Sequence, residues 1–128
     1  MEQITIEGLY QKLKEKITTA SNLEEFYIGR TDDLEQRRKI HLQKDKLPFT
    51  LSLAKGKKDI ISKAEEYLQS KYMDNPKCSN ERIGGGSKGG ILYISYKNSI
   101  SNMKTIDDVH DEEFEWENEY ELINRKEL

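Results

Sequence analysis

The sequence lacks the residues that build disulfide-linked, zinc-binding or membrane-spanning proteins. It holds a single cysteine, Cys78, in 128 residues, which excludes an internal disulfide framework and a zinc site made of cysteines. It contains no run of about 18 apolar residues, the length that a membrane-spanning helix requires. The first residues, MEQITIEG, have neither the basic start nor the apolar centre of a signal peptide. We therefore expect a cytoplasmic protein that does not enter a membrane.

Apolar residues are also scarce, and charge is unevenly distributed. Hydrophobic residues make up 34% of the chain and charged residues 35%, which is enough for one small core. Residues 1–104 hold 19 Lys and Arg against 14 Asp and Glu, whereas residues 105–128 hold 2 against 10. We expect one mildly basic domain over residues 1–104 and an acidic C-terminal extension over residues 105–128.

Apolar periodicity predicts an α+β domain in which helices flank a small, mostly antiparallel sheet. Helices are expected at 6–17, from a capping box of Thr31 or Asp32 with Glu35 to about 44, and at 59–73. Strands are expected at 26–28, 49–53 and 91–96. In the acidic extension, aromatic residues alternate with glutamates in FEWENEYEL (residues 114–122), which predicts a further strand or a segment that orders on a partner.

The second expected helix carries cations on the face that should anchor it. At about 100° per residue, Leu34, Arg37, Arg38 and His41 share one side of this helix. One interpretation is that this face borders a cleft, where arginine binds phosphate and histidine transfers a proton. The other is that these side chains are simply solvated.

The third expected helix separates two neighbouring glutamates. Glu65 borders its apolar stripe, whereas Glu66 points to water. A carboxylate at the edge of a buried stripe can enter a cleft and bind a divalent cation, although a surface glutamate beside lysine has the same pattern. The segment IGGGSKGG (residues 83–90) lacks the spacing of a nucleotide P-loop, which favours a loop that closes over a cleft.

The stretch FYIGRTDDLEQRRKIH resembles the second half of the GIY-YIG nuclease signature. The matching residues are Tyr27, Ile28, Gly29, Thr31, Leu34, Arg37 and His41. Two later segments, AEEYLQSKY and CSNERIGGGSKGG, look like those that supply the metal-binding glutamate and the asparagine of that family. They would provide Glu65 and Asn80.

The resemblance implies an endonuclease that hydrolyses phosphodiester bonds, in DNA before RNA, with one Mg²⁺ or Mn²⁺ ion on Glu65. Tyr27 would deprotonate water, Arg37 would stabilise the phosphate, His41 would assist proton transfer and Asn80 would position the loop. Arg30, Arg38 and Lys88 are the further side chains expected to contact nucleic acid.

The sequence departs from the family because the opening GIY strand is not found before Tyr27. The tyrosine of that missing strand is commonly assigned as the general base of the family. The strand ILYISY could replace the missing strand, with Tyr93 or Tyr96 as the base, or Tyr27 itself could act with His41. Alternatively nothing replaces it, and the chain is a weak or inactive binding protein. That protein would be a phage or mobile-element accessory factor acting through its acidic tail, which could mimic nucleic acid, cover the cleft or dock on a partner. Residues 114–122 could also join two copies of the chain.

Overall fold

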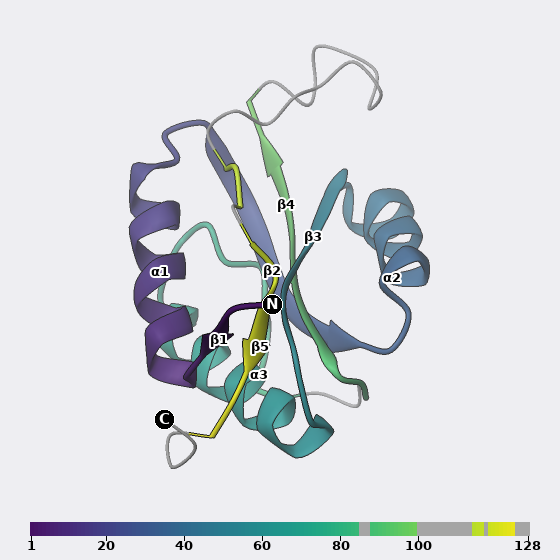
Figure 1. Ribbon diagram of the computed structural model, residues 1–128. Coiled ribbons are helices and arrows are strands. Elements are labelled where there is room, and N and C mark those ends of the chain that lie inside the picture. The colour runs from purple at the N-terminus through teal and green to yellow at the C-terminus, as the bar shows by residue number, and fades with distance from the viewer. Residues whose placement is uncertain (85–87, 100–113, 117, 125–128) are drawn as a thin grey trace.

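The fold is a five-stranded sheet with helices on both faces (Figure 1). The computed structural model describes residues 1–84, 88–99, 114–116 and 118–124. The elements follow the chain as β1 (Gln3–Ile4), α1 (Ile6–Thr19), β2 (Leu23–Thr31), α2 (Leu34–Ile40), the π-helical turn η1 (His41–Asp45), β3 (Phe49–Lys55), α3 (Lys58–Tyr72), β4 (Ile91–Asn98) and β5 (Tyr120–Leu122). The predicted α+β class is confirmed.

The sheet is mixed rather than mostly antiparallel. Its strand order is β1-β5-β3-β4-β2. β4 lies in antiparallel register between β2 and β3, and these long pairings follow the prediction. β5 runs parallel to both β1 and β3, which the sequence did not predict. β1 was missed altogether, because two residues are too few to show an alternating pattern.

One face of the sheet carries the apolar core. Figure 1 shows α1 and α3 on one side of the sheet and α2 on the other. Leu9, Leu13 and Ile17 of α1 pack with Ile61 and other apolar residues of α3 against the strands. The predicted α1 is confirmed with its cap, since the Thr5 hydroxyl accepts a hydrogen bond from the Gly8 amide.

The second helix begins one residue later than predicted and ends differently. Asp33, rather than Thr31 or Asp32, is its cap and accepts a hydrogen bond from the Gln36 amide. The α-helical hydrogen bonding stops at Ile40, and a π-helical turn carries the chain to Asp45. Lys46 then adopts a left-handed conformation with φ of 59°, which ends the turn. π-Helical turns within helices frequently occur at functional sites.

Part of the acidic C-terminal segment, Tyr120–Leu122, forms strand β5 of the sheet. β5 lies between β1 and β3, and the side chains of Phe114, Tyr120 and Leu122 are buried in the core. The aromatic face expected to join two chains or to bind a partner is therefore used within the chain. Residues 105–113 lie outside the described residues.

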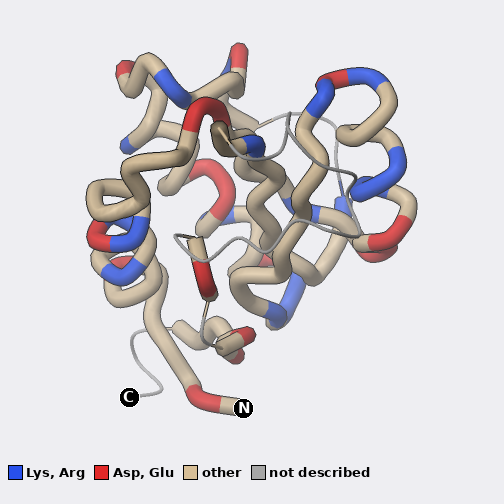
Figure 2. Tube along the Cα trace, turned by 90° about the horizontal axis from the view of Figure 1, so that it is seen from above, with Lys and Arg blue, Asp and Glu red and all other residues tan. Residues whose placement is uncertain are grey.

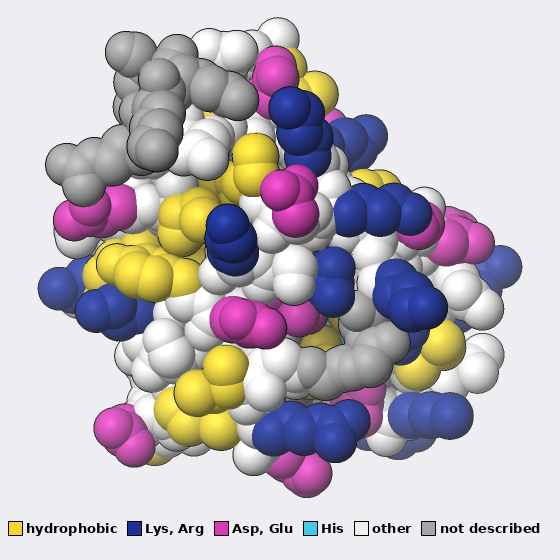
Figure 3. Space-filling view, turned by 90° about the horizontal axis from the view of Figure 1, so that it is seen from below, with side chains coloured by type: hydrophobic (Ala, Val, Ile, Leu, Met, Phe, Trp, Pro, Cys, Tyr) yellow, Lys and Arg dark blue, Asp and Glu magenta, His cyan; other side chains and the backbone are white. Residues whose placement is uncertain are grey.

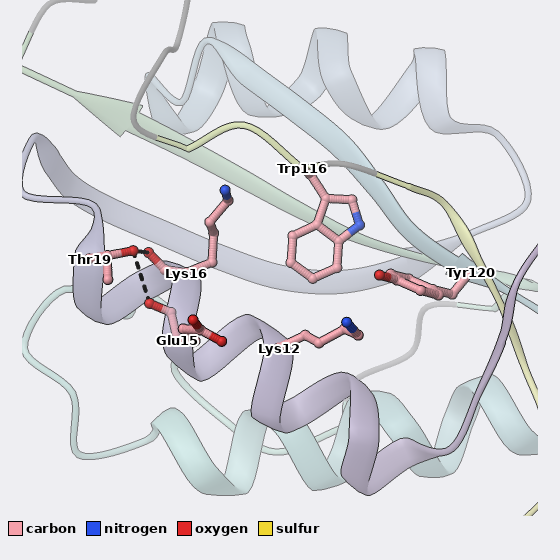
Figure 4. Close-up of a pocket in the computed structure, with 6 residues that line it drawn as sticks. All are labelled: Lys12, Glu15, Lys16, Thr19, Trp116 and Tyr120. Carbon is pink, nitrogen blue, oxygen red and sulfur yellow. Dashed lines mark hydrogen bonds between the residues drawn. The ribbon is translucent and has the colours of Figure 1, made fainter.

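The C-terminal segment also packs against α1 around a hollow of about 180 Å³ (Figure 4). Trp116 and Tyr120 lie on one side of this hollow, and Lys12 and Lys16 of α1 on the other. The Lys12 ammonium lies 5.7 Å from the centroid of the Tyr120 ring, a cation–π distance. Basic side chains of the first helix therefore contact aromatic residues of the acidic segment.

Charged residues of both signs are interspersed along the described trace (Figure 2). The charge asymmetry of the sequence therefore does not divide the described part of the fold into a basic half and an acidic half. No helix formed by the described residues is long and apolar enough to cross a bilayer.

Candidate active site

Two tyrosines meet on the face of the sheet opposite the apolar core. Gly29 of β2 is paired with Tyr93 of β4, so the Tyr93 side chain lies across the glycine. A Cβ atom at Gly29 would lie 2.6 Å from the Tyr93 hydroxyl oxygen and 2.9 Å from the Tyr27 ring. The two tyrosine rings are 6.4 Å apart. Gly29 is thus the residue that allows both rings to occupy this face.

His41 joins the tyrosines from the start of the π-helical turn. Its Nε2 lies 2.8 Å from the Tyr93 hydroxyl, and its Nδ1 lies 2.7 Å from Oδ2 of Asp45. Its ring is 4.7 Å from that of Tyr27. His41 is only 5% exposed, and burial lowers its pKa from 6.5, although Asp45 acts in the opposite direction. A neutral imidazole therefore connects Asp45 to Tyr93.

Arg37 brings positive charge to this cluster from α2. Its charge lowers the pKa of Tyr27, of Tyr93 and of His41, so it lies close to all three. Its Nε atom is buried and has no hydrogen-bond partner among the described residues. A buried guanidinium nitrogen without a partner is costly, and an anionic ligand would satisfy it.

Glu65 of α3 acts on the same tyrosines from the edge of the sheet. Its charge raises the pKa of Tyr27 and of Tyr93, although burial is the larger cause for both hydroxyls. Its own pKa is raised, mainly by burial and against the influence of Arg30. Arg30 Nε lies 3.4 Å from Oε1 of Glu65, and the Glu65 side chain is 5% exposed. The guanidinium of α2 and the carboxylate of α3 therefore act on one pair of hydroxyls.

Asn80 anchors the segment that follows α3 to the edge strand β2. Its amide oxygen accepts a hydrogen bond from the Ile28 amide, and its amide nitrogen donates to the Ile28 carbonyl. Gln69 of α3 donates to the same carbonyl and accepts from the Gly84 amide. Asn80 thus satisfies the outer edge of β2 beside Tyr27, which is a positioning role.

A groove of about 460 Å³ opens beside these residues. Its lining includes Tyr27, Asp45, Asn80 and Arg82, so it reaches the cluster from the side of β2. Figure 3 shows the molecule from below, where Lys and Arg side chains are more numerous over one half of that face. The groove itself is lined by three acidic side chains, Glu25, Asp45 and Glu81, and by one basic side chain, Arg82.

Several predicted residues do not join the cluster. Tyr96 faces the apolar core, where its ring stacks 5.1 Å from Phe49 and lies 4.9 Å from Phe114, so it is no candidate for the general base. Arg38 is paired with Glu35 at 2.6 Å, which also removes Glu35 from the capping role expected of it. Lys88 is exposed just before β4.

Sequence reasoning missed Asp45 and Gln69. Asp45 lies one residue beyond the predicted end of the second helix, in the π-helical turn, four residues after His41. Gln69 is one helical turn after Glu65, so both lie on the same face of α3. This spacing could have identified Gln69 as a residue near the site.

A divalent cation fits this site only as an ion shared with a substrate. Among the described residues, no three His, Cys, Asp or Glu side chains gather as a metal-binding group. Mg²⁺, however, is commonly held by one or two carboxylates together with substrate phosphates and water. Glu65 is buried and desolvated at the edge of the cluster, and Arg30 is its ion-pair partner. Glu65 is therefore the residue that would hold such an ion.

Comparison with known proteins assigns no family. No family model matches the chain, and no solved structure matches it. The chain is similar to the tyramine–L-glutamate ligase of Methanocaldococcus jannaschii, with 24% identity over 97 residues that make up 76% of this chain. Those residues are 32% of the ligase, so the chain spans about a third of the length of this curated relative.

Proposed function

We propose that this chain is a GIY-YIG-type hydrolase that cleaves phosphodiester bonds in nucleic acid, with DNA as the substrate to test first. The observation that carries the proposal is the cluster of Tyr27, Tyr93 and His41 beneath α2, where the buried Nε of Arg37 has no partner among the described residues and the charge of Glu65 also acts on the tyrosines. Phosphoryl transfer needs a base for water, a cation for the phosphate and charge stabilisation for the leaving oxygen. This cluster contains a candidate for each.

Tyr93 is the stronger candidate for the general base. It lies on β4, the strand that pairs antiparallel with the one carrying Tyr27, where a substitute for the absent GIY strand was expected. Burial holds its pKa above the usual range, so the phenol keeps its proton near neutral pH. It can take a proton from water only while passing its own proton to Nε2 of His41, 2.8 Å away.

The proposed reaction balances through this hydrogen-bonded chain. Water gives its proton to Tyr93, Tyr93 gives its proton to His41, and the resulting hydroxide attacks phosphorus. The bond from phosphorus to the leaving ester oxygen breaks, and that oxygen takes a proton from solvent. Arg37 binds the phosphate oxygens as negative charge increases. Mg²⁺ or Mn²⁺, when bound at Glu65, would supply positive charge near the leaving oxygen.

One observation favours a second candidate, which is nucleic-acid binding without cleavage. The Glu65 carboxylate already has an ion-pair partner, because Arg30 Nε lies 3.4 Å away. If Arg30 keeps this carboxylate, a cation cannot use it, and Arg37 with the neighbouring basic side chains would bind nucleic acid without cutting it. The ligase similarity favours neither candidate, because a match to 32% of that enzyme does not carry its activity.

Plasmid cleavage tests the proposal with matched variants. We expect the unmodified protein to nick or linearise plasmid DNA in Mg²⁺ or Mn²⁺, and Arg37→Ala and Glu65→Ala each to lose about 10²–10³-fold in rate. The matched controls are Lys39→Ala on α2 and Glu66→Ala on α3, which change the same charges on exposed neighbouring positions and should retain the rate. Cleavage that survives Arg37→Ala and Glu65→Ala contradicts the mechanism.

Binding measurements separate the two candidates. Fluorescence anisotropy with a labelled DNA duplex reports binding whether or not the DNA is cut. Binding that Arg37→Ala weakens, without cleavage by the unmodified protein, identifies the second candidate. A protein that neither binds nor cleaves DNA or RNA excludes both.

A further inference from the structure

Asp45 makes a contact that its position in the fold does not require. Its side chain is 50% exposed, yet Oδ2 lies 2.7 Å from Nδ1 of the buried His41. Asp45 also lines the groove that opens beside Tyr27. An exposed carboxylate without a role in the core would be free to remain in water, so this contact points to a task at His41.

The contact determines which imidazole nitrogen carries the proton. An ionised carboxylate only accepts hydrogen bonds, so a neutral His41 must carry its proton on Nδ1 to bond with Asp45. Nε2 is then an acceptor, and the hydrogen bond at 2.8 Å must be donated by the Tyr93 hydroxyl. In the other tautomer, Nε2 would donate to Tyr93 and could not receive its proton.

The charged and titratable groups around His41 come from four elements. Asp45 faces it from η1, Arg37 acts on it from α2, Tyr27 packs on it from β2, and Tyr93 bonds to it from β4. Burial and Arg37 lower the pKa of His41, whereas Asp45 raises it through its hydrogen bond and its charge. Asp45 thus opposes the loss of the proton and stabilises the imidazolium.

We infer that Asp45 is a positioning residue that holds His41 as the Nδ1–H tautomer, so that Nε2 can accept the proton of Tyr93. Three residues on two separate elements, β4 and η1, then form a directional hydrogen-bonded path from Tyr93 through His41 to Asp45. The effect of this path on rate rests on the proposed hydrolysis. The tautomer itself is a property of the folded protein and can be measured without any substrate.

Nitrogen NMR tests the tautomer directly. The chain has two histidines, His41 and His110, so protein labelled with ¹⁵N-histidine gives two sets of ring signals, and His110→Gln assigns them. Above the pKa of His41, we expect a protonated Nδ1 and an unprotonated Nε2. In Asp45→Ala we expect protonation to move to Nε2 and the pKa of His41 to fall. Asp45→Glu, which keeps a carboxylate, should restore Nδ1–H.

Kinetics test the positioning role. For Asp45→Ala we expect kcat to fall within the range of about 10²–10⁴-fold that positioned proton transfer supplies, with KM unchanged. The acidic limb of the pH–rate profile should move to lower pH with the pKa of His41. A merely structural loss would lower the amount of active protein without moving that limb, and unchanged amide spectra establish that the variant is folded.

The outcomes distinguish this inference from the proposed function. Nε2–H in the unmodified protein, or an unchanged tautomer and pKa in Asp45→Ala, overturns the inference even if the protein cleaves DNA. A switched tautomer with unchanged kcat overturns the positioning role alone. If the unmodified protein cleaves nothing, the proposed hydrolysis fails. The NMR result still decides which imidazole nitrogen of His41 carries the proton.

Discussion

The two faces of the β2–β4 strand pair differ sharply although they are made by alternating residues of the same two strands. On one face Phe26, Ile28 and Ile94 pack beneath α1 and α3 in the apolar core. On the other face Tyr27 and Tyr93 lie beneath α2 and the π-helical turn, beside Arg37 and His41. The first face stabilises the protein, and the second holds groups that can transfer protons.

The covering helices explain this difference. α3 buries seven side chains along its length, whereas α2 buries none fully. A short helix that covers a face only partly leaves space for polar groups and a groove. Buried polar groups are costly unless they are hydrogen-bonded. The chain from Asp45 through His41 to Tyr93 meets that condition, whereas Nε of Arg37 has no partner among the described residues.

The largest expected effect comes from removing one hydroxyl from each face of β4. Tyr93→Phe removes the hydroxyl bonded to His41, and we expect cleavage to slow by about 10²–10⁴-fold because proton transfer is lost. Tyr96→Phe makes the same chemical change three residues away, on the apolar face. It should leave the cleavage rate unchanged. Initial rates of plasmid nicking measure both, and equal losses would contradict the division between the faces.

The apolar face should dominate stability. Ile94 is fully buried, so Ile94→Ala should lower the free energy of unfolding by about 2–5 kcal/mol through lost burial and the cavity that remains. Ser95→Ala, on the next residue and the opposite face, removes a hydrogen bond of 2.6 Å to Thr50 and should cost about 0.5–1.5 kcal/mol. Urea unfolding midpoints at an unchanged slope give both values. A larger cost for Ser95→Ala would reverse this ranking.

Gly29 affects both the stability of the fold and the rate of cleavage. A Cβ atom there would lie 2.6 Å from the Tyr93 hydroxyl, so Gly29→Ala must displace the ring. We expect a loss of about 1–3 kcal/mol in stability, as for overpacking, together with slower cleavage. In a Tyr93→Ala background the ring is absent, and the same substitution should cost less stability. Additive costs, measured in a double-mutant cycle, would show that the two residues do not compete for space.

The smallest expected effect is on the pH dependence of stability. The pKa of His41 is lowered from 6.5 by burial, so the unfolded chain binds more protons than the folded protein below about pH 6.5. The contribution of His41 is therefore fully present above that pH and is lost as the pH falls towards the lowered pKa. Because Asp45 partly offsets the effect of burial on this pKa, we expect a smaller loss of stability than for Ile94→Ala.

His41→Gln tests whether His41 causes stability to fall as the pH falls. Glu65 has the opposite dependence, because its raised pKa makes the folded protein bind more protons above about pH 4.5. We expect the urea midpoint of the unmodified protein, measured from pH 4 to pH 8, to decrease below pH 6.5, and we expect this decrease to be absent in His41→Gln. A curve that His41→Gln leaves unchanged would show that this imidazole does not titrate differently in the folded protein.

Local patterns predicted the elements that are long and strongly periodic. α1 with its Thr5 cap, α3 and β4 were all expected near their observed bounds. Helical periodicity expected Arg37 and Glu65 to face one cleft; in the structure they lie on helices on opposite faces of the sheet, and the charges of both act on Tyr27. These results depend only on neighbours within a helix or strand, which the sequence records directly.

Features that depend on distant parts of the chain could not be predicted in the same way. The position of β5 between β1 and β3 is set by tertiary pairing, and no local pattern reports it. The π-helical turn was not expected, and Asp45 was missed because the second helix was predicted to end at about residue 44, just before it. The cap moved to Asp33 because three neighbouring residues, Thr31, Asp32 and Asp33, were all competent for it.

The placement of β5 has a consequence for how the polypeptide is made. β1 pairs with β5, so Gln3 and Ile4 leave the ribosome long before their partners Glu121 and Leu122 have been translated. Until then the outer edge of β3 at Ala54 and Lys55 also lacks the strand that covers it. A nascent chain halted before residue 120 would expose that unpaired edge, where another chain can add a strand. Synthesis of residues 120–122 is therefore the step that closes the sheet and protects it from aggregation.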